Sequence, residues 1–321
     1  MMKKTAVLLF AALVTSVPAF AQIDLSGSWQ YRQHEDWQDR APGPDAVDFT
    51  GLPLNEDGKA RALRYSTSSL SLPERECILY APYYVVTGPF GIHMWSDTDM
   101  VTGQIVAWNI SAMGDRAATK IWMDGRPEPP ANALHTFGGF TTGRWQGTTL
   151  VARTTHFKNG WLRRNGAPTS DKATITMYIT RHDDTLTIFG IIEDPVYLAR
   201  PQVVSRNWVI APTINVPIVP NPCVPEAELA SLQGEGTVPS YLPGENPFLN
   251  EMAGRYNIPF DAVMGGAEKQ LPEYRKALKD KYVAPPMCVR YCCGWKSGSE
   301  PVAPTLTCLV SGTAVPASKG R

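Results

Sequence analysis

Histidine is the residue type in this sequence whose placement most invites acid–base chemistry. All five histidines lie between positions 34 and 182. Imidazole exchanges protons near neutral pH, so two histidines facing one cavity could move protons to and from a substrate. His135 precedes the glycine loop Thr136-Phe137-Gly138-Gly139, and His156 ends a β-rich run at 149–155. We take His135 and His156 as candidate catalytic residues; the alternative is that each is a hydrogen-bonded structural residue.

Asp194 is the third candidate catalytic residue. It lies in Glu193-Asp194-Pro195, where a carboxylate could form a proton relay with His156. The alternative is that Asp194 caps the turn before Pro195 and that Arg200 neutralises it. A metal site from His135, His156 and Asp194 lacks support, since the sequence has no His-x-His or His-Glu-x-x-His pair. We expect no metal and no cofactor, because P-loop and dinucleotide fingerprints are also missing.

Aromatic and basic residues form the candidate ligand-binding set. Arg144 and Trp145 could hold an anionic or aromatic ligand together, or could form a cation–π pair that only closes a turn. Arg163 could lie at an anion-holding rim; its neighbour Arg164 would point to the opposite face. Large aromatic side chains on strands form apolar pockets with few polar groups. The full set is Arg144, Trp122, Arg163, Tyr197 and Trp108.

These residues allow three functional hypotheses. The first is binding of a small, largely apolar molecule without chemistry. The second is an enzyme that performs isomerisation, cyclisation, elimination or hydrolysis on a hydrophobic substrate. The third is an envelope interaction module whose tail binds an unknown protein partner. An α/β-hydrolase is disfavoured, because the sequence lacks both the Gly-x-Ser-x-Gly motif and a βαβ pattern.

The candidate residues lie in a region of short β-rich runs separated by turn residues. A tight turn is expected at 143–147, and the clearest hairpin joins 173–181 to 185–192 through a turn at 181–184. Strands are predicted at 29–32, 83–87, 91–96, 105–109, 119–123, 149–155, 173–181, 185–192 and 203–210. The pattern favours an all-β fold: an antiparallel meander that forms a calycin-like barrel of about eight to ten strands, or alternatively a β-sandwich.

Helices are expected outside this region. One is predicted at 54–65 with Asn55 as its N-cap, and two more at 248–256 and 272–281. Leu271, Tyr274, Leu278 and Tyr282 recur at helical spacing, which predicts packing against the β domain.

The first 21 residues have the pattern of a secretory signal peptide. Lys3 and Lys4 precede an apolar run, and Ala19-Phe20-Ala21 forms an Ala-x-Ala cleavage site; a membrane span would need about 20 apolar residues. Cleavage leaves 28 basic and 30 acidic residues, a formal charge of −2. We therefore expect a soluble periplasmic or secreted chain that neither spans a membrane nor binds nucleic acid.

Four regions follow from this reading: a signal peptide at 1–21, a β-barrel domain at 22–212, a proline-rich linker at 213–247 and a helical, disulfide-stapled C-terminal region at 248–321. The linker contains a charged helical patch at 225–233. An even number of cysteines in an exported protein predicts disulfides rather than a metal site. The six are Cys77, Cys223, Cys288, Cys292, Cys293 and Cys308.

Gly27-Ser28-Trp29 at the head of the meander resembles the Gly-x-Trp motif of lipocalins. That resemblance implies a Trp that closes the barrel floor and an Arg from a late strand that packs on it, for which Arg206 is the candidate. More broadly, residues 24–212 resemble a family of uncharacterised exported bacterial proteins that are lipocalin-like. The matching segments are 24–29, 121–127, 143–145, 149–151, 161–165 and 193–195. The resemblance implies the fold and the location but no activity.

Overall fold

The structure is a computed structural model that describes residues 23–32, 46–65, 82–87, 91–112, 118–163, 165–213, 240–256, 258–279, 308–310 and 313–315. The signal peptide, the helical patch at 225–233, His34, Arg164 and Tyr282 lie outside these ranges. The side chain of every cysteine does too, so the disulfide prediction is not addressed by the structure.

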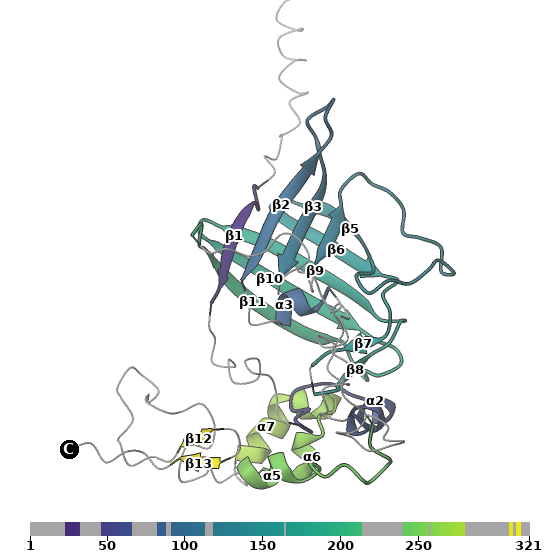
Figure 1. Ribbon diagram of the computed structural model, residues 1–321, viewed down its shortest axis with the longest axis vertical. Coiled ribbons are helices and arrows are strands. Elements are labelled where there is room, and N and C mark those ends of the chain that lie inside the picture. The colour runs from purple at the N-terminus through teal and green to yellow at the C-terminus, as the bar shows by residue number, and fades with distance from the viewer. Residues whose placement is uncertain are drawn as a thin grey trace, which may run out of the picture.

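Nine strands form a closed barrel, which confirms the predicted all-β barrel over the β-sandwich (Figure 1). The order around the barrel is β1-β11-β10-β9-β6-β5-β4-β3-β2, and β1 also pairs with β2 to close it. The strands are β1 Gly27–Tyr31, β2 Ile92–Thr98, β3 Ile105–Ala112, β4 Thr119–Trp122, β5 Phe140–Gln146, β6 Thr149–Thr155, β9 Thr174–His182, β10 Thr185–Glu193 and β11 Gln202–Ile210. The predicted hairpin is β9–β10, with Thr185 opposite His182.

Alternate residues of each strand fill the inside of the barrel. Successive side chains of a strand point to opposite faces, so one set of apolar residues from all the long strands meets in the centre. These inward residues are each at most 1% exposed: Trp29, Ile92, Met94, Trp108, Ile110, Ile121, Leu150, Ala152, Ile175, Met177, Ile179, Leu186, Ile188 and Trp208. Burial on this scale stabilises the fold by roughly 1.5–3 kcal/mol for each large apolar side chain.

Three local predictions are wrong. The run at 83–87 is not a strand: helix α3, Tyr84–Thr87, is buried against β3, β10 and β11. Its Val86 lies beside the inward face of Gly190, where a Cβ would be 3.5 Å away. The predicted turn at 143–147 is mostly strand β5, and the turn follows it, with Gln146 opposite Thr149. The barrel is also not wholly antiparallel, because β4 and β5 run parallel.

The Arg that packs on Trp29 comes from β9. The Arg181 guanidinium lies 5.2 Å from the ring centroid of Trp29 and donates a hydrogen bond to the Asp24 carbonyl at 2.7 Å. Arg206 instead pairs in register with Ile188 and donates to the Ser205 carbonyl. Arg181 therefore takes the place that the resemblance suggested for Arg206, and the resemblance itself stays a prediction.

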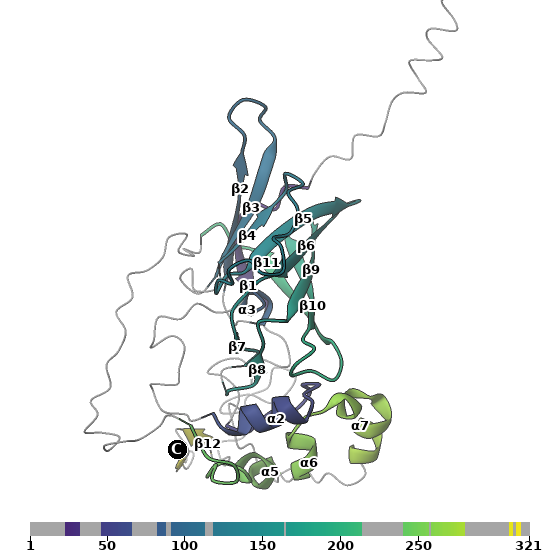
Figure 2. The same ribbon diagram turned by 90° about the vertical axis from the view of Figure 1, so that its right-hand side faces the viewer.

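Short helices gather below the barrel (Figures 1 and 2). Helix α2, Glu56–Leu63, confirms the predicted N-cap, since the Asn55 side chain accepts a hydrogen bond from the Gly58 amide. The others are α5 Glu251–Tyr256, α6 Phe260–Val263, η3 Ala267–Gln270 and α7 Pro272–Lys279. Two small ribbons complete the fold: β7 Gly160–Trp161 with β8 Pro168–Thr169, and β12 Cys308–Val310 with β13 Thr313–Val315.

The segments 46–65 and 240–279 pack on each other. The Phe49 amide donates to the Val263 carbonyl, and the Gly266 amide donates to the Leu52 carbonyl. Leu271 is exposed, and the contacts of α7 are with η3. The expected packing of the helical stripe at 271–282 against the barrel is therefore not observed for its described part.

Candidate functional site

His135 and His156 come together, but the hydrogen bonds of both rings serve the fold. Their ring centroids are 5.2 Å apart. His135 Nδ1 is 3.1 Å from the Phe157 carbonyl. The two ring nitrogens of His156 contact the Thr155 hydroxyl at 2.8 Å and the Pro130 carbonyl at 3.0 Å. His156 also has a φ of 56°, an unusual value for a residue with a Cβ. The pair joins the end of β6 to the loop before β5, and its acid–base role stays a prediction.

Asp194 is a turn cap. It is 3% exposed, and its carboxylate accepts hydrogen bonds from the Ser170 amide and hydroxyl, each at 2.7 Å, and from the Val196 and Tyr197 amides. A carboxylate with four donors is already satisfied. Within the described residues no hydrogen bond joins it to either histidine, so the proposed relay gains no support.

The ligand-binding candidates are spread over the molecule. Trp108 lies inside the barrel, and Arg144 is exposed on the outer face of β5. Trp145 follows on the inner side, opposite Leu150, so the two do not stack. Arg163 donates to the Asp48 carbonyl at 3.3 Å, and Tyr197 lines a cavity beside α2. Trp122 alone of the set lies in the larger cavity described next.

A groove of about 370 Å³ opens in the barrel wall where β4 and β5 separate. The parallel pairing holds only at Ile121–Thr141 and Trp122–Thr142, so Thr119 and Lys120 at the start of β4 are not paired with β5. We call this cavity the wall groove. It is lined by Trp95, Asn109, Ile110, Ala118, Thr119, Lys120, Trp122, Gly138, Gly139, Phe140 and Thr141.

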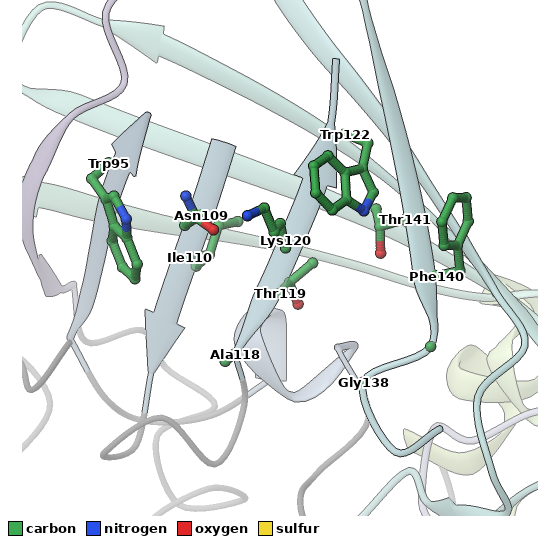
Figure 3. A pocket seen from close by; sticks show the side chains of 11 residues that line it. Trp95, Asn109, Ile110, Ala118, Thr119, Lys120, Trp122, Gly138, Phe140 and Thr141 are labelled. Atoms are coloured by element: carbon green, nitrogen blue, oxygen red, sulfur yellow. The ribbon is translucent and has the colours of Figure 1, made fainter. Parts of the chain in front are cut away.

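Outward-facing side chains from three neighbouring strands form the polar centre of the wall groove. Strand register aligns Trp95 with Asn109 and Asn109 with Lys120. Figure 3 shows Asn109 and Lys120 between the Trp95 and Trp122 indoles. Two rings flanking an amide and an ammonium group offer a ligand both apolar surface and hydrogen-bond donors.

Asp97 fixes the position of the Lys120 side chain. Lys120 Nζ lies 2.8 Å from Asp97 Oδ2, and this hydrogen bond is the main cause that lowers the pKa of the Asp97 carboxyl. The Asn109 amide also contributes to this lowering, although its Nδ2 completes no hydrogen bond of ordinary geometry within the protein. The ion pair therefore holds one cation at the groove, beside the Asn109 amide.

Two buried polar atoms that line the wall groove lack hydrogen-bond partners. Asn109 Nδ2 and Thr119 Oγ1 are both unpaired, in side chains that are 9% and 4% exposed. Buried polar groups nearly always have a partner, and an unpaired one costs about 1–3 kcal/mol. Register pairs Asn109 with the outward residue Lys120 and Thr119 with the inward residue Ile110, so the two atoms lie on opposite faces of the wall at one opening. A ligand would need a separate hydrogen-bond acceptor for each atom to remove this cost.

The loop before β5 supports the Trp122 side of the wall groove. The Arg126 guanidinium lies 3.5 Å from the Trp122 ring centroid, and Lys120 Nζ lies 4.5 Å from it. Farther along, Glu128 accepts a hydrogen bond from Arg153 at 3.0 Å. The contact of His156 with Pro130 holds the same loop. The histidines thus act on the groove through this loop and are not among its lining residues.

Sequence reasoning identified Trp122 as a ligand-binding candidate and Trp95 as one of several strand tryptophans that could line a pocket, but missed Asn109, Lys120 and Thr119. A usable signal lay in the two-residue period of the strands: Trp95 and Trp122 follow the inward residues Met94 and Ile121, which places both indoles outside. Cross-strand register cannot be read from one sequence, so the meeting of these side chains was not foreseeable.

Within the described ranges, no group of three or more His, Cys, Asp or Glu side chains is placed to hold a metal ion. None of the helices in those ranges is both long and apolar enough to cross a bilayer.

Comparisons of the chain with protein-family models, curated proteins and solved structures give no match.

Proposed function

We propose that the barrel binds a small molecule in the wall groove. The ligand has a flat, largely apolar body that lies against Trp95 and Trp122, and hydrogen-bond acceptors that reach the Asn109 amide and, at the opening between β4 and β5, the Thr119 hydroxyl. The observation that carries this proposal is that two residues lining one cavity, Asn109 and Thr119, each bury a polar atom without a partner. The groove volume of about 370 Å³ lies within the usual range for small-molecule sites.

The proposal places the ligand in the wall rather than in the centre of the barrel. The inward apolar side chains given above are each at most 1% exposed, and α3 occupies space beside Gly190. A ligand in the centre would have to displace Trp29, Trp108 or Trp208. The wall groove is already an open cavity of about 370 Å³.

The direct test is mass spectrometry of small molecules carried through native purification of the exported protein. Gly138→Leu is the informative variant, since a Cβ there would meet only the Ala118 carbonyl, at 4.0 Å. The new side chain fills the groove with little backbone strain. We expect wild-type protein to carry a ligand and Gly138→Leu to carry at least tenfold less.

Two matched controls accompany this test. Arg144→Gln changes an exposed residue outside the groove lining and should leave the amount of ligand unchanged. His135→Ala separates binding from catalysis: the binding proposal expects retention of the same molecule, whereas an enzyme would accumulate a different one. Equal ligand in Gly138→Leu and wild type would refute the wall groove as the site.

We also propose that this binding takes place after export to the periplasm. Lys3, Lys4 and the Ala-x-Ala site before residue 22 support this location. Fractionation of cells that express the full chain tests it. The protein should appear in the periplasmic fraction with Gln22 as its first residue, and full-length protein in the cytoplasm would contradict the proposal.

A further inference from the structure

We propose that a second cavity, between α2 and the β7–β8 ribbon, binds a small aromatic carboxylate. We call it the α2 pocket. Its volume is about 220 Å³. It is lined by Arg61, Arg64, Tyr65, Asn159, Gly160, Trp161, Gly166, Pro168, Thr169, Tyr197 and Ser240. It shares no lining residue with the wall groove, so this inference stands independently of the function proposed above.

The walls of the α2 pocket are formed by segments that pack closely at two glycines. Gly58 on α2 lies against the Tyr197 carbonyl, to which a Cβ would come within 2.4 Å. Gly166, with a φ of +94°, leaves room for the Tyr65 ring, because a Cβ there would overlap that side chain. The pocket is therefore a product of fixed packing between α2, the ribbon and the turn that contains Tyr197.

The charge of the α2 pocket is positive. Arg61 and Arg64 line it, and no carboxylate does. Neither guanidinium forms an ion pair with the residues that the structure describes. Guanidinium groups bind carboxylates through paired N–H donors, so two unpaired ones at one cavity favour an organic acid.

The C-terminal end of α2 does not oppose an anion strongly. A helix C-terminus carries partial negative charge on its last carbonyls. Here each of those carbonyls accepts a hydrogen bond. The Arg64 amide donates to the Arg61 carbonyl and the Tyr65 amide donates to the Ala62 carbonyl. The Asn246 side chain donates to the Leu63 carbonyl, and the Tyr241 amide donates to the Arg64 carbonyl. The full charges of Arg61 and Arg64 therefore dominate the pocket.

Polar and aromatic groups complete the α2 pocket. Thr169 Oγ1 is buried, 2% exposed as a residue, and has no hydrogen-bond partner. Asn159 Oδ1 accepts from the Asp171 amide at 2.8 Å, which leaves its NH₂ group as a donor. The Trp161 and Tyr65 rings meet edge to face, 6.4 Å between centroids. Together these groups fit a planar ring that carries a carboxylate.

The size of the α2 pocket limits the ligand. Sites for drug-sized molecules hold roughly 300–1,000 Å³, so about 220 Å³ suits a single ring with its acid group. Benzoate is therefore a suitable probe. Benzamide has the same ring without the charge, and cyclohexanecarboxylate has the charge without the aromatic ring.

Isothermal titration calorimetry of the full chain tests the inference. We expect saturable benzoate binding, with benzamide at least tenfold weaker because charge-assisted hydrogen bonds are lost. Cyclohexanecarboxylate should be several-fold weaker than benzoate. The double variant Arg61→Gln/Arg64→Gln should weaken benzoate at least tenfold, whereas the matched variant Arg144→Gln should not change its affinity.

Three outcomes would overturn the inference: no saturable benzoate binding by wild type, benzamide equal to benzoate, or unchanged affinity in the double variant. Inorganic phosphate that binds as tightly as benzoate would refute the aromatic part. The comparison of benzoate with benzamide uses wild type alone and does not depend on how the variants fold. Thr169→Val adds a readout: benzoate should bind more weakly, while the unfolding temperature does not fall.

Discussion

At the residue scale, the wall groove contains two buried polar side chains that destabilise the folded protein. Thr119 and Asn109 bury polar atoms without partners, on strands where an apolar residue of the same shape would fit. An unpaired buried group in a native protein calls for an explanation, and a functional role is one. The ligand proposal explains why these two residues stand where valine or leucine would be more stable.

Thr119→Val should therefore stabilise the ligand-free protein. The change keeps the shape and removes an unpaired hydroxyl, so we expect a gain of about 1 kcal/mol and a rise in the unfolding midpoint of roughly 2–4 °C. Differential scanning calorimetry measures it. The matched variant Thr154→Val should instead be destabilised by about 1–3 kcal/mol, because it removes the 2.8 Å bond between the Thr154 and Thr141 hydroxyls.

His156 provides a second test at this scale. Both His156→Ala and His156→Gly lose the bonds to Thr155 and Pro130, but only alanine must adopt the φ of 56° with a Cβ. We expect the glycine variant to be more stable than the alanine variant by about 1 kcal/mol. Urea denaturation of both gives the difference. Equal midpoints would mean that the loop relaxes and that the left-handed backbone at His156 is not held by the fold.

At the element scale, the separation of β4 from β5 creates the site, and Gly143 shows how tightly the strands meet above it. A Cβ at Gly143 would lie 2.5 Å from Ile121 Cγ2 and 2.6 Å from Met123 Sδ. Ile121 is fully buried and its Cγ2 cannot move alone. Gly143→Ala should cost about 1–3 kcal/mol through overpacking.

Gly254→Ala is the matched control for Gly143→Ala, because no atom lies within 4 Å of a Cβ there and alanine is the better helix former. It should be neutral or slightly stabilising. Chemical denaturation of both variants checks the contrast. A neutral Gly143→Ala would contradict the close packing of β5 on β4.

The same elements show which parts of the fold are readable from sequence. The β9–β10 hairpin was correctly predicted because strict alternation specifies both strand and register. Strand β5 was missed because Gly143 is a poor strand residue in isolation, and its packing on Ile121 comes from a distant segment. Helix α3 was misread because Tyr-Val-Val-Thr favours strands, and burial inside the barrel overrides that preference.

At the scale of the whole molecule, the barrel closes where β1 meets β2. Ser28 pairs with His93 across this seam, and their side chains are 2.9 Å apart. Burial lowers the pKa of His93 below its usual value of 6.5. The unfolded chain therefore binds this proton more readily than the folded chain.

Stability should consequently fall as the pH drops below 6.5 and through the lowered pKa of His93. His93→Gln keeps a polar partner for Ser28 but does not titrate, so its unfolding free energy should depend less on pH between pH 8 and 5. Denaturation curves at several pH values for both proteins measure this. Parallel pH profiles would show that His93 does not contribute to acid sensitivity.

The closed barrel as a whole was predictable, but the location of the cavity was not. Regular β-rich runs and several strand tryptophans were visible along the chain, and these tryptophans were expected to line a hollow inside the barrel. Large side chains can either fill the inside of a barrel or leave a cavity there. The outcome depends on their three-dimensional packing and on the position of α3, and neither can be predicted from the pattern of the strands. The sequence therefore predicted a cavity inside the barrel, whereas the groove lies in the barrel wall.

Indole NMR tests the central claim most directly. Each of the nine tryptophans gives one Nε1–H signal, assignable by single Trp→Phe substitutions, and the ligand released from purified protein can be titrated back. If the ligand occupies the wall groove, the signals of Trp95 and Trp122 shift together and saturate, while those of Trp29, Trp108 and Trp208 stay in place. Shifts confined to the three inner tryptophans would contradict the account and place the ligand in the centre of the barrel.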